Sequence, residues 1–488
     1  MVASHKLYIG GNWVNSESGE TFTSHNPATE KPIGVFQKAG EGDVERAVKA
    51  AESAYKKWKA VPAPKRGEIL FRFAGLLRQN KEELARLVTL EMGKVLGEAR
   101  GDVQEAIDTA EYFAGEGRRL FGHTTPSELR DKFAMTVRMP VGVFGVITPW
   151  NFPIAIPAWK LMPALVCGNT AVFKPASDTP LCATRFVELL EKAGVPKGVV
   201  NMVTGPGDPT GTVLVRHPRI RGISFTGSRD TGEFILRNAV LKRVGLELGG
   251  KNGIIIMPDA DLGLALDGVI WGGFGTTGQR CTAASRVIVH ESVRQKFESM
   301  LASRTKRLRL GPGLDAKTDV GPLINKHAVE KTHKYVTAGL SEGAKLLCGG
   351  KPYGKAGYFY QPTLFTGVAP DMKIAQEEIF GPVVSLISVR NIDEAIDVMN
   401  SIKYGLSSSI YTADINAAFR AIQEIEAGIT YVNAPTIGAE VHLPFGGIKQ
   451  TGNGTREAGI EGINEFSETK TVYIDYSGRL QRAQIDVD

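Results

Sequence analysis

One cysteine of this chain stands apart from the others in its surroundings. Cys281 lies in the stretch GTTGQRCTAASR, among glycines and small hydroxyl residues. A free cysteine is usually a small buried hydrophobic residue. That structural interpretation suits Cys167, Cys182 and Cys348, which lie in stretches of Ala, Leu and Val or at the end of the apolar run KLLC. It does not suit Cys281, whose thiol is therefore a candidate for chemistry.

Two further polar residues stand in apolar surroundings. Asn151, in PWNFP, follows the β-rich run VGVFGVIT. An amide among aromatic rings costs free energy unless its donors are used, so Asn151 either caps the next helix or aims its NH₂ group at an oxyanion. Glu247, in LELGGK, is either paired with a nearby Lys or Arg or acts as a general base. Burial among leucines favours a raised carboxyl pKa, which suits a base near neutral pH.

Two glycine-rich turns come after predicted strands and open predicted helices. The first is TGPGDPTG, with Gly207 and Gly211, and the second is FTGSRDTG, with Gly227 and Ser228. Glycines at such turns let backbone amides approach a phosphate at a helix N-terminus, although a simple strand-to-helix turn explains each one nearly as well. Two such turns in succession favour a dinucleotide-binding site more than either turn alone does.

The elements that position these residues follow from periodicity. Residues 43–60 repeat apolar side chains at steps of three and four, which predicts one face of a helix. From residue 141 short β-rich runs alternate with stretches of helical length, which predicts βαβ units and a mostly parallel sheet. The alternation starts afresh near residue 249, so we expect a second α/β domain. The final run TKTVYIDYSG alternates like a strand and needs a sheet to join.

Composition narrows the class of protein. A chain of 488 residues exceeds what one hydrophobic core normally serves. Its 58 basic and 52 acidic residues are interspersed, which argues against a nucleic-acid partner. Four scattered cysteines without a CxxC pair argue against disulfides and a metal site and favour a reducing compartment. With neither a secretory signal nor an apolar run of about 20 residues, we expect a cytoplasmic protein without a membrane partner.

Together these motifs resemble the aldehyde dehydrogenase superfamily. VGVFGVITPWNFP, FKPASDTP, FTGSRDTG, LELGGK, GTTGQRCTAASR, AQEEIFGPV and PFGGIKQTGNGTREAG occur in the family's order and approximate spacing. The resemblance extends from about Leu7 to Tyr473. Within the family, the tail and the stretch WNFPIAIPAW look most like bacterial and archaeal semialdehyde or glyceraldehyde dehydrogenases, such as 2,5-dioxovalerate dehydrogenase.

The resemblance implies an α/β fold with a Rossmann-like cofactor domain, a second α/β catalytic domain and a small β oligomerisation arm. The dinucleotide-binding domain would comprise residues 1–118 and 141–248, and the catalytic domain residues 249–447. Residues 119–140 and 467–488 would form the bridging segment. A neighbouring subunit would accept the terminal strand, in a homodimer or a homotetramer.

The resemblance also implies a covalent mechanism that oxidises an aldehyde to the carboxylic acid. Cys281 would add to the aldehyde carbon, and Asn151 with the Cys281 N–H would hold the oxyanion. Hydride transfer would leave a thioester, and Glu247 would activate water. The cofactor would contact Thr148, Pro149, Trp150, Lys174, Ser177, Gly207, Gly211, Phe225, Gly227, Ser228, Glu378 and Phe380. The substrate pocket would be lined by Phe152, Trp159, Arg280, Thr282 and Phe445.

Two of these residues carry alternatives. Arg280 is either a salt-bridged surface arginine or a cation that attracts the distal carboxylate or hydroxyls of a polar aldehyde. Ser177 replaces a glutamate found in many NAD-preferring relatives, which removes a charge that would repel the 2′-phosphate of NADP. We therefore expect NADP to be accepted and preferred, with NAD also used. Alternatively, Ser177 caps the helix beginning near Thr179.

Competing functions are an acylating dehydrogenase that uses coenzyme A and a catalytically silent binding protein on the same scaffold. Acylating enzymes generally lack the glutamate, so Glu247 argues against the first. Retention of Asn151, Lys174, Cys281 and Glu378 argues against the second. A serine hydrolase is excluded because no GxSxG occurs.

Overall fold

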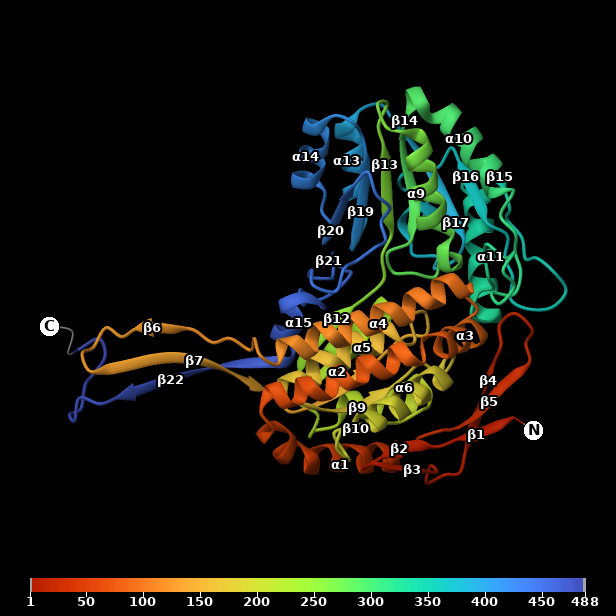
Figure 1. Cartoon of the computed structure of the whole chain (residues 1–488). Coiled ribbons are helices and arrows are strands. Elements are labelled where there is room, and N and C mark those ends of the chain that lie inside the picture. Colours follow the sequence, from red (N-terminus) through yellow and green to blue (C-terminus); the bar gives the residue numbers. More distant parts are fainter. Residues whose placement is uncertain (1, 486–488) are drawn as a thin grey trace.

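The computed structural model describes residues 2–485 and contains two large sheets, one above the other in Figure 1. The lower sheet has the strand order β12-β11-β8-β9-β10-β2-β3, and β8 to β12 pair in parallel. Its strands are β2 (Leu7–Ile9), β3 (Asn12–Val14), β8 (Val143–Ile147), β9 (Thr170–Lys174), β10 (Val200–Met202), β11 (Gly222–Thr226) and β12 (Arg243–Glu247). From β8, the chain builds first toward β10 and then, on the other side, toward β12. A topological switch point therefore lies between β8 and β11.

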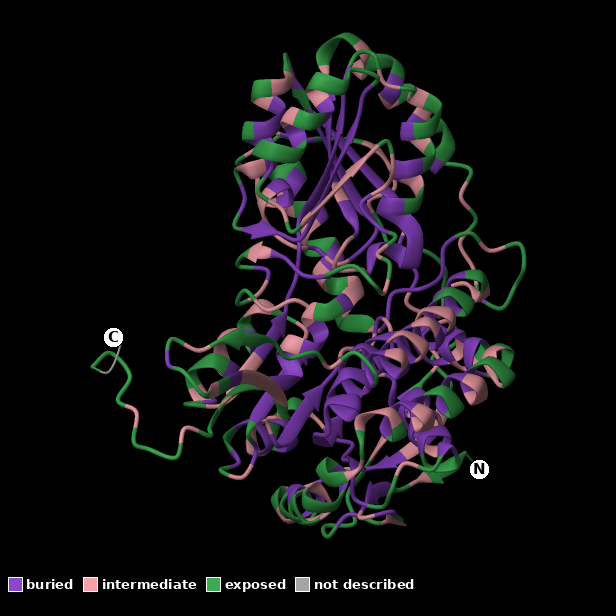
Figure 2. Ribbon diagram, turned by 60° about the vertical axis from the view of Figure 1, so that its left-hand side comes forward, coloured by how far each residue is buried: buried purple, intermediate pink, exposed green. Residues whose placement is uncertain are grey.

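Helices cover both faces of this sheet, and its strands are almost wholly buried (Figure 2). The helices are α1 (Glu41–Ala60), α2 (Ala63–Gln79), α3 (Lys81–Met92), α4 (Leu96–Glu116), α5 (Ala155–Cys167), α6 (Pro180–Ala193), the turn η1 (Gly207–Gly211), α7 (Thr212–Arg216) and α8 (Arg229–Asn238). The helix predicted over residues 43–60 is α1. Of the five apolar positions predicted for one face, four are buried and Tyr55 is half-buried; the buried ones are Val44, Val48, Ala51 and Trp58. A small sheet joins β1 (Ala3–His5), β5 (Pro32–Gln37) and β4 (Thr21–His25).

The upper sheet has the order β15-β16-β17-β14-β13-β19-β20, in which only β15 runs antiparallel to its neighbour. Its strands are β13 (Asn252–Ile256), β14 (Ala284–His290), β15 (Lys345–Cys348), β16 (Thr363–Thr366), β17 (Val383–Val389), β19 (Ser407–Tyr411) and β20 (Ile429–Val432). Its helices are α9 (Leu262–Phe274), the turn η2 (Gly275–Gly278), α10 (Glu291–Thr305), α11 (Lys326–Ser341), α12 (Lys373–Gln376), α13 (Ile392–Asn400) and α14 (Ile415–Glu424). Two short strands, β18 (Tyr404–Gly405) and β21 (Ile448–Lys449), pair with each other. Helix α15 (Gly459–Phe466) then leads into the last strand of the chain.

A three-stranded arm extends to the left in Figure 1, away from both large sheets. It has the order β22-β7-β6 and consists of β6 (Thr124–Pro126), β7 (Lys132–Pro140) and β22 (Ser467–Asp475). Strand β22 pairs along its whole length with β7 of the same chain and lies at the edge of the arm, so acceptance of its other side by a neighbouring subunit stays a prediction. The strand does not have one buried face within the chain, since Tyr473 and Ile474 are both exposed. Residues 486–488 of the predicted bridging segment lie outside the described residues.

The prediction of an α/β fold with two sheet-based units and a β arm is confirmed. The two large sheets use strands on either side of residue 249, and the predicted domain limits stay a proposal. Within residues 2–485, no helix is both long enough and apolar enough to cross a membrane.

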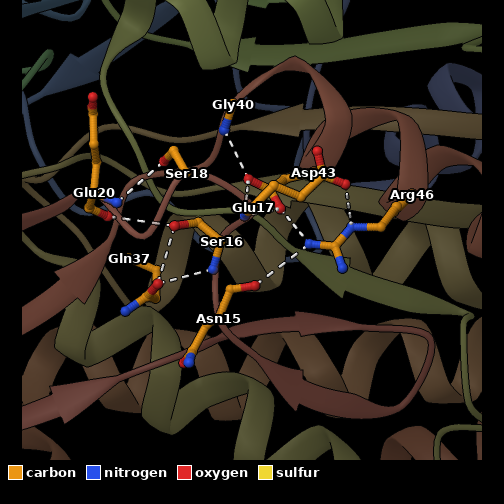
Figure 3. Close-up of polar contacts among 9 residues, drawn as sticks. All are labelled: Asn15, Ser16, Glu17, Ser18, Glu20, Gln37, Gly40, Asp43 and Arg46. Atoms are coloured by element: carbon orange, nitrogen blue, oxygen red, sulfur yellow. Dashed lines mark hydrogen bonds and ion pairs between the residues drawn. The ribbon is translucent and has the colours of Figure 1, made fainter.

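The start of α1 is held by a buried carboxylate (Figure 3). Asp43 accepts hydrogen bonds from the backbone N–H groups of Gly40, at 2.9 Å, and Glu17, at 3.1 Å, and it is ion-paired with Arg46. Because Asp43 is in the first turn of α1, its negative charge also complements the helix dipole. This network fixes the segment before α1, which contacts the first predicted phosphate-binding turn.

Candidate active site

A cavity of about 260 Å³ lies where α4 and α5 of the lower unit face the loops of the upper one. Seven of the predicted catalytic and pocket residues line it. These are Phe152, Trp159, Glu247, Arg280, Cys281, Thr282 and Phe445. They come from α5 and the loop before it, the end of β12, the segment after η2 and the loop before β21. Residues far apart in the sequence are thus brought to one space.

Cys281 is carried by a strained turn. In η2, Thr276 and Thr277 have φ angles of 52° and 59°, a left-handed conformation that is costly for β-branched residues. Glu98 holds this turn, because its carboxylate accepts hydrogen bonds from the Thr276 N–H, at 2.9 Å, and from the Thr276 hydroxyl, at 3.2 Å. On the other side, Asn252 donates to the Cys281 carbonyl at 2.7 Å. The turn places a half-buried Cys281 on the cavity wall.

The glycine pair of LELGGK is explained by close approaches to this turn and to Glu378. A Cβ atom on Gly250 would lie 2.6 Å from the Cys281 carbonyl oxygen. A Cβ atom on Gly249 would lie 2.2 Å from a Glu378 carboxylate oxygen. Any side chain at either position would push apart segments that the cavity needs together.

Glu247 ends β12 and is buried, yet it has no partner. Among residues 2–485, neither of its carboxylate oxygens has a hydrogen-bond partner, so the interpretation of a structural ion pair was wrong. Burial is the main reason that its pKa is raised well above the ordinary value, and the negative charges of Glu457 and Glu465 raise it further. Lys160 acts in the opposite direction but is itself ion-paired with Glu457. A free, desolvated carboxylate faces the cavity.

The thiol of Cys281 is not intrinsically acidic here. Burial raises its pKa to about 12, and the nearby carboxylates of Glu247 and Glu378 contribute in the same direction. Without a bound ligand, the Cys281 thiol is therefore protonated at neutral pH. Any reaction as a thiolate needs a group that takes up this proton.

Asn151 does not cap the following helix. The N-cap of α5 is Ile154, and no side chain bonds there. Instead, the Asn151 amide donates to the backbone carbonyl of Gln279 at 3.0 Å, which ties it to the turn that carries Cys281. One of its two N–H groups is used by this bond, and the other has no acceptor within residues 2–485.

The cavity walls combine aromatic rings with one cation. Trp159 and Phe445 meet edge to face, with ring centroids 4.7 Å apart. The Arg280 guanidinium lies over the Trp271 ring, 4.7 Å from its centroid, and 3.6 Å from the Glu98 carboxylate. Arg280 is thus salt-bridged, as one interpretation held, but it is largely buried and lines the cavity instead of the outer surface.

Sequence reasoning missed the part of the cavity wall that α4 supplies, including its three acidic residues. Glu98, Asp102 and Glu105 line the cavity together with Trp271 and Glu457. Their spacing was a usable signal, since positions four and seven residues apart share one face of a helix. Acidic residues recurring on a helix whose alanines and valines are buried indicate a polar cavity beneath it.

The residues predicted to bind the cofactor gather at the carboxyl edge of the lower sheet. Thr148, Pro149 and Trp150 follow β8, Lys174 ends β9, and Gly227 and Ser228 follow β11, whose Phe225 is buried. The Thr148 N–H donates to the Lys174 carbonyl at 3.2 Å. Because this edge includes the switch point, it forms the crevice in which open α/β sheets bind ligands.

The residues of this crevice fit a dinucleotide. Ser228 is the N-cap of α8, so the positive end of that helix dipole opens onto the crevice beside Gly227. The Lys174 amine has one bond, to the Pro175 carbonyl at 3.2 Å, and its other donors are unused within the described chain. Burial lowers its pKa to about 8. An anionic pyrophosphate and ribose hydroxyls would satisfy these groups.

Ser177 contacts the first glycine-rich turn and caps no helix. The N-cap of α6 is Thr179, and the Ser177 hydroxyl donates to the Gly205 carbonyl at 2.8 Å. The same turn is joined to the segment before α1, because the Ala39 N–H donates to the Thr204 carbonyl at 2.8 Å. Gly207 and Gly211 lie in η1, directly after this contact. The capping interpretation of Ser177 was wrong.

Glu378 and Phe380 reach the crevice from the upper unit. Glu378 accepts one hydrogen bond, from the Gly250 N–H at 3.1 Å, and burial raises its pKa. The Phe380 and Trp150 rings meet edge to face with centroids 5.5 Å apart. Glu378 and Gly250 therefore connect the crevice directly to the segment between Glu247 and Cys281.

Comparison with known proteins identifies the family. Residues 13–472 match the Aldehyde dehydrogenase family. The chain belongs to this family. It is an aldehyde dehydrogenase, an oxidoreductase that uses NAD(P) to oxidise aldehydes. The comparisons favour this activity over coenzyme-A-dependent acylation and over a silent scaffold.

Similar aldehyde dehydrogenases include two named for semialdehydes or dioxo acids. The alpha-ketoglutaric semialdehyde dehydrogenase of Bacillus subtilis is 43% identical over 474 residues, covering 96% of this chain and 97% of that one. The 2,5-dioxopentanoate dehydrogenase of Saccharolobus solfataricus is 40% identical, covering 95% and 98%. A betaine aldehyde dehydrogenase mutant from Staphylococcus aureus, solved in complex with NAD+, has a TM-score of 0.95 and 36% identity, covering 98% and 97%.

Proposed function

We propose that this aldehyde dehydrogenase oxidises a small polar semialdehyde to the acid through a thioester on Cys281. The observation that carries the proposal is that Cys281 and an unpartnered, buried Glu247 line one cavity. A nucleophile and a base beside a shared cavity suit covalent catalysis followed by hydrolysis.

The first half-reaction joins sulfur to carbon. The Cys281 sulfur bonds to the aldehyde carbon while its proton passes to a base, and the carbonyl electron pair moves onto oxygen. The half-buried Cys281 thiol loses this proton to solvent, and Glu247 is kept for the second half-reaction. The second N–H of Asn151 and the backbone N–H of Cys281 hold the oxyanion. A bound nicotinamide supplies the hydride acceptor that makes the adduct a thioester.

The second half-reaction hydrolyses that thioester. Glu247 takes a proton from water as the water oxygen bonds to the acyl carbon, and the carbon–sulfur bond then breaks. The acid leaves, and the Cys281 sulfur is restored as thiolate. Because burial raises the pKa of Glu247, its carboxylate is a stronger proton acceptor than an exposed one, which suits a base that takes a proton from water.

The cavity supports a polar substrate with an acidic far end. Phe152, Trp159 and Phe445 provide apolar walls for a short carbon chain, and Arg280 provides a cation. The names of the Bacillus and Saccharolobus relatives refer to an aldehyde that also bears an acid group. We infer that the substrate of this enzyme has the same two ends.

For the cofactor, we infer that NADP is accepted and preferred and that NAD is also used. Ser177 places no negative charge beside the predicted ribose site, and Lys174 retains unused donors there. A 2′-phosphate would meet a cation and a hydroxyl, and the Asp178 carboxylate, whose charge acts on Lys174, would be its nearest competitor. The dinucleotide-binding domain of this proposal comprises residues 1–118 and 141–248, and the catalytic domain residues 249–447.

We also infer a homodimer or homotetramer that works in the cytoplasm. In the single chain, the edge strand β22 exposes Tyr473 and Ile474, and β7 exposes Phe133. Exposed apolar side chains on an edge strand are a liability unless another surface covers them. The cytoplasmic location rests on four cysteines that are all free thiols.

The proposed function is tested with a set of aldehydes that carry or lack a distal carboxylate, each assayed with NAD and with NADP. We expect turnover to the acid, fastest with a carboxylate-bearing aldehyde and NADP. The Cys281→Ala variant is the control, since it should bind cofactor but not turn over. Appreciable turnover by Cys281→Ala, or no oxidation of any aldehyde by the wild type, would contradict the proposal.

A further inference from the structure

One carboxyl group of the cavity has no assigned task. Of the three acidic residues of α4 that line the cavity, Glu98 holds Thr276 and lies 3.6 Å from Arg280. Asp102 accepts from Lys94, at 3.1 Å. Glu105 is different, since it has no hydrogen bond or ion pair from its side chain anywhere within residues 2–485.

Glu105 is close to the reacting residues. It lines the same cavity as Cys281, and its charge acts on the thiol in the direction of a higher pKa. It is half-buried, so that its carboxyl meets the cavity instead of bulk solvent. An unpartnered polar group in this position is normally completed by a ligand.

We propose that Glu105, in its protonated form, donates a hydrogen bond to the distal carboxylate of the substrate and so selects aldehydes with an acidic end. The inference rests on the proposed oxidation of a carboxylate-bearing aldehyde. Arg280 supplies the compensating positive charge on the same cavity wall. A carboxylic acid and an arginine together can satisfy both oxygens of a carboxylate.

The surrounding charges favour this assignment. Buried Lys94 is paired with Asp102, and Arg280, the cation of the cavity lining, lies 3.6 Å from Glu98. Asp108 adds a further negative charge near Glu105, so an ionised Glu105 would be an unbalanced anion. A neutral Glu105 adds no charge that would repel a substrate anion from Arg280.

The protonation state of Glu105 follows from burial and from its neighbours. Burial raises its pKa to about 8, and the negative charges of Asp102 and Asp108 act in the same direction. Lys94 and Arg280 oppose the shift. Below pH 8 the carboxyl is a donor, and above pH 8 it is an anion that repels the substrate carboxylate.

The test compares kcat/KM for 5-oxopentanoate with that for pentanal, at pH 7 and at pH 9.5, with saturating cofactor. Titration of Cys281 and Glu247 affects both aldehydes and cancels in the ratio of the two values. From the pKa of about 8, the protonated fraction of Glu105 falls roughly thirtyfold between these pH values, and the ratio should fall with it. In Glu105→Gln, whose amide donates without titrating, the ratio should be nearly flat.

Glu111→Gln is the matched control, because it makes the same substitution on the same helix at a residue that is ion-paired with Arg78 outside the cavity. It should keep the wild-type pH dependence. A ratio that is flat with pH in the wild type would overturn the role of Glu105 while leaving the dehydrogenase function intact. Preference for 5-aminopentanal over 5-oxopentanoate at pH 7 would also overturn it. Absence of activity with every aldehyde would instead contradict the proposed function.

Discussion

Replacing Glu247 with Gln separates the two half-reactions of the proposed mechanism. The change exchanges one oxygen for an NH₂ group and removes a negative charge, with almost no change in shape. Because both Glu247 oxygens lack partners within residues 2–485, the substitution breaks no hydrogen bond in the protein. Its effects should therefore be chemical, with little change in stability.

The size of the effect follows from the surroundings of Glu247. The other nearby carboxylate, Glu457, is ion-paired with Lys160 and is a poor substitute base. Loss of a general base slows a step by roughly 10²–10⁴-fold, or about 3–5 kcal/mol. The sign of the pH dependence is fixed by the raised pKa of Glu247. Wild-type kcat should fall as the pH is lowered through that pKa, and Glu247→Gln should lack this decline.

The assay is stopped-flow detection of the reduced cofactor. If Glu247 mainly serves hydrolysis, Glu247→Gln should give a burst close to one reduced cofactor per active site, followed by slow turnover. The alkylation rate of Cys281 by iodoacetamide is a second measurement. Removing the Glu247 charge should lower the thiol pKa and speed alkylation.

Two results would refute this reasoning in different ways. No burst together with slower alkylation would mean that Glu247 is needed to activate the thiol. Unchanged steady-state turnover would mean that Glu247 is structural.

Three further predictions test other parts of the molecule. Ser177→Glu should raise KM for NADP far more than for NAD in steady-state kinetics, and equal effects would show that Ser177 does not face the ribose. Glu465 is buried, and its pKa is raised to about 7. The folded state is therefore destabilised relative to the unfolded state as the pH rises from 4.5 to 7. The free energy of unfolding is measured with urea at fixed protein concentration, at pH 5 and at pH 8. Between these two pH values, Glu465→Gln should gain up to about 3 kcal/mol of stability relative to the wild type. A difference between variant and wild type that does not change with pH would contradict this. Light scattering at micromolar concentration should give a dimer or tetramer, and a monomer would contradict the role of the arm.

Local sequence pattern was enough to predict the kinds of element and the residues with chemical potential. The apolar repeat over residues 43–60 gave α1, because side chains three and four residues apart share a helix face. The small residues around Cys281 and the leucines around Glu247 are also local features. They indicated a nucleophile and a desolvated carboxylate before any contact between the two was known.

Partners that lie far apart in the chain were decided only by tertiary packing. The sequence allowed Asn151 and Ser177 to cap helices, yet they bond to the carbonyls of Gln279 and Gly205. Likewise, an alternating strand at the end of the chain does not specify its neighbour, and β22 found β7 of the same chain. Periodicity fixes which way a side chain points, but only the packed fold fixes what it meets.

The cavity shows the same division. Glu98, Asp102 and Glu105 form a repeat that the sequence displays, but their tasks differ because their neighbours differ. Glu98 meets Thr276, which is 178 positions away, whereas Glu105 meets only the cavity. Burial and the charges of neighbouring elements then set the pKa of each group, and these arise from long-range contacts that local pattern does not encode.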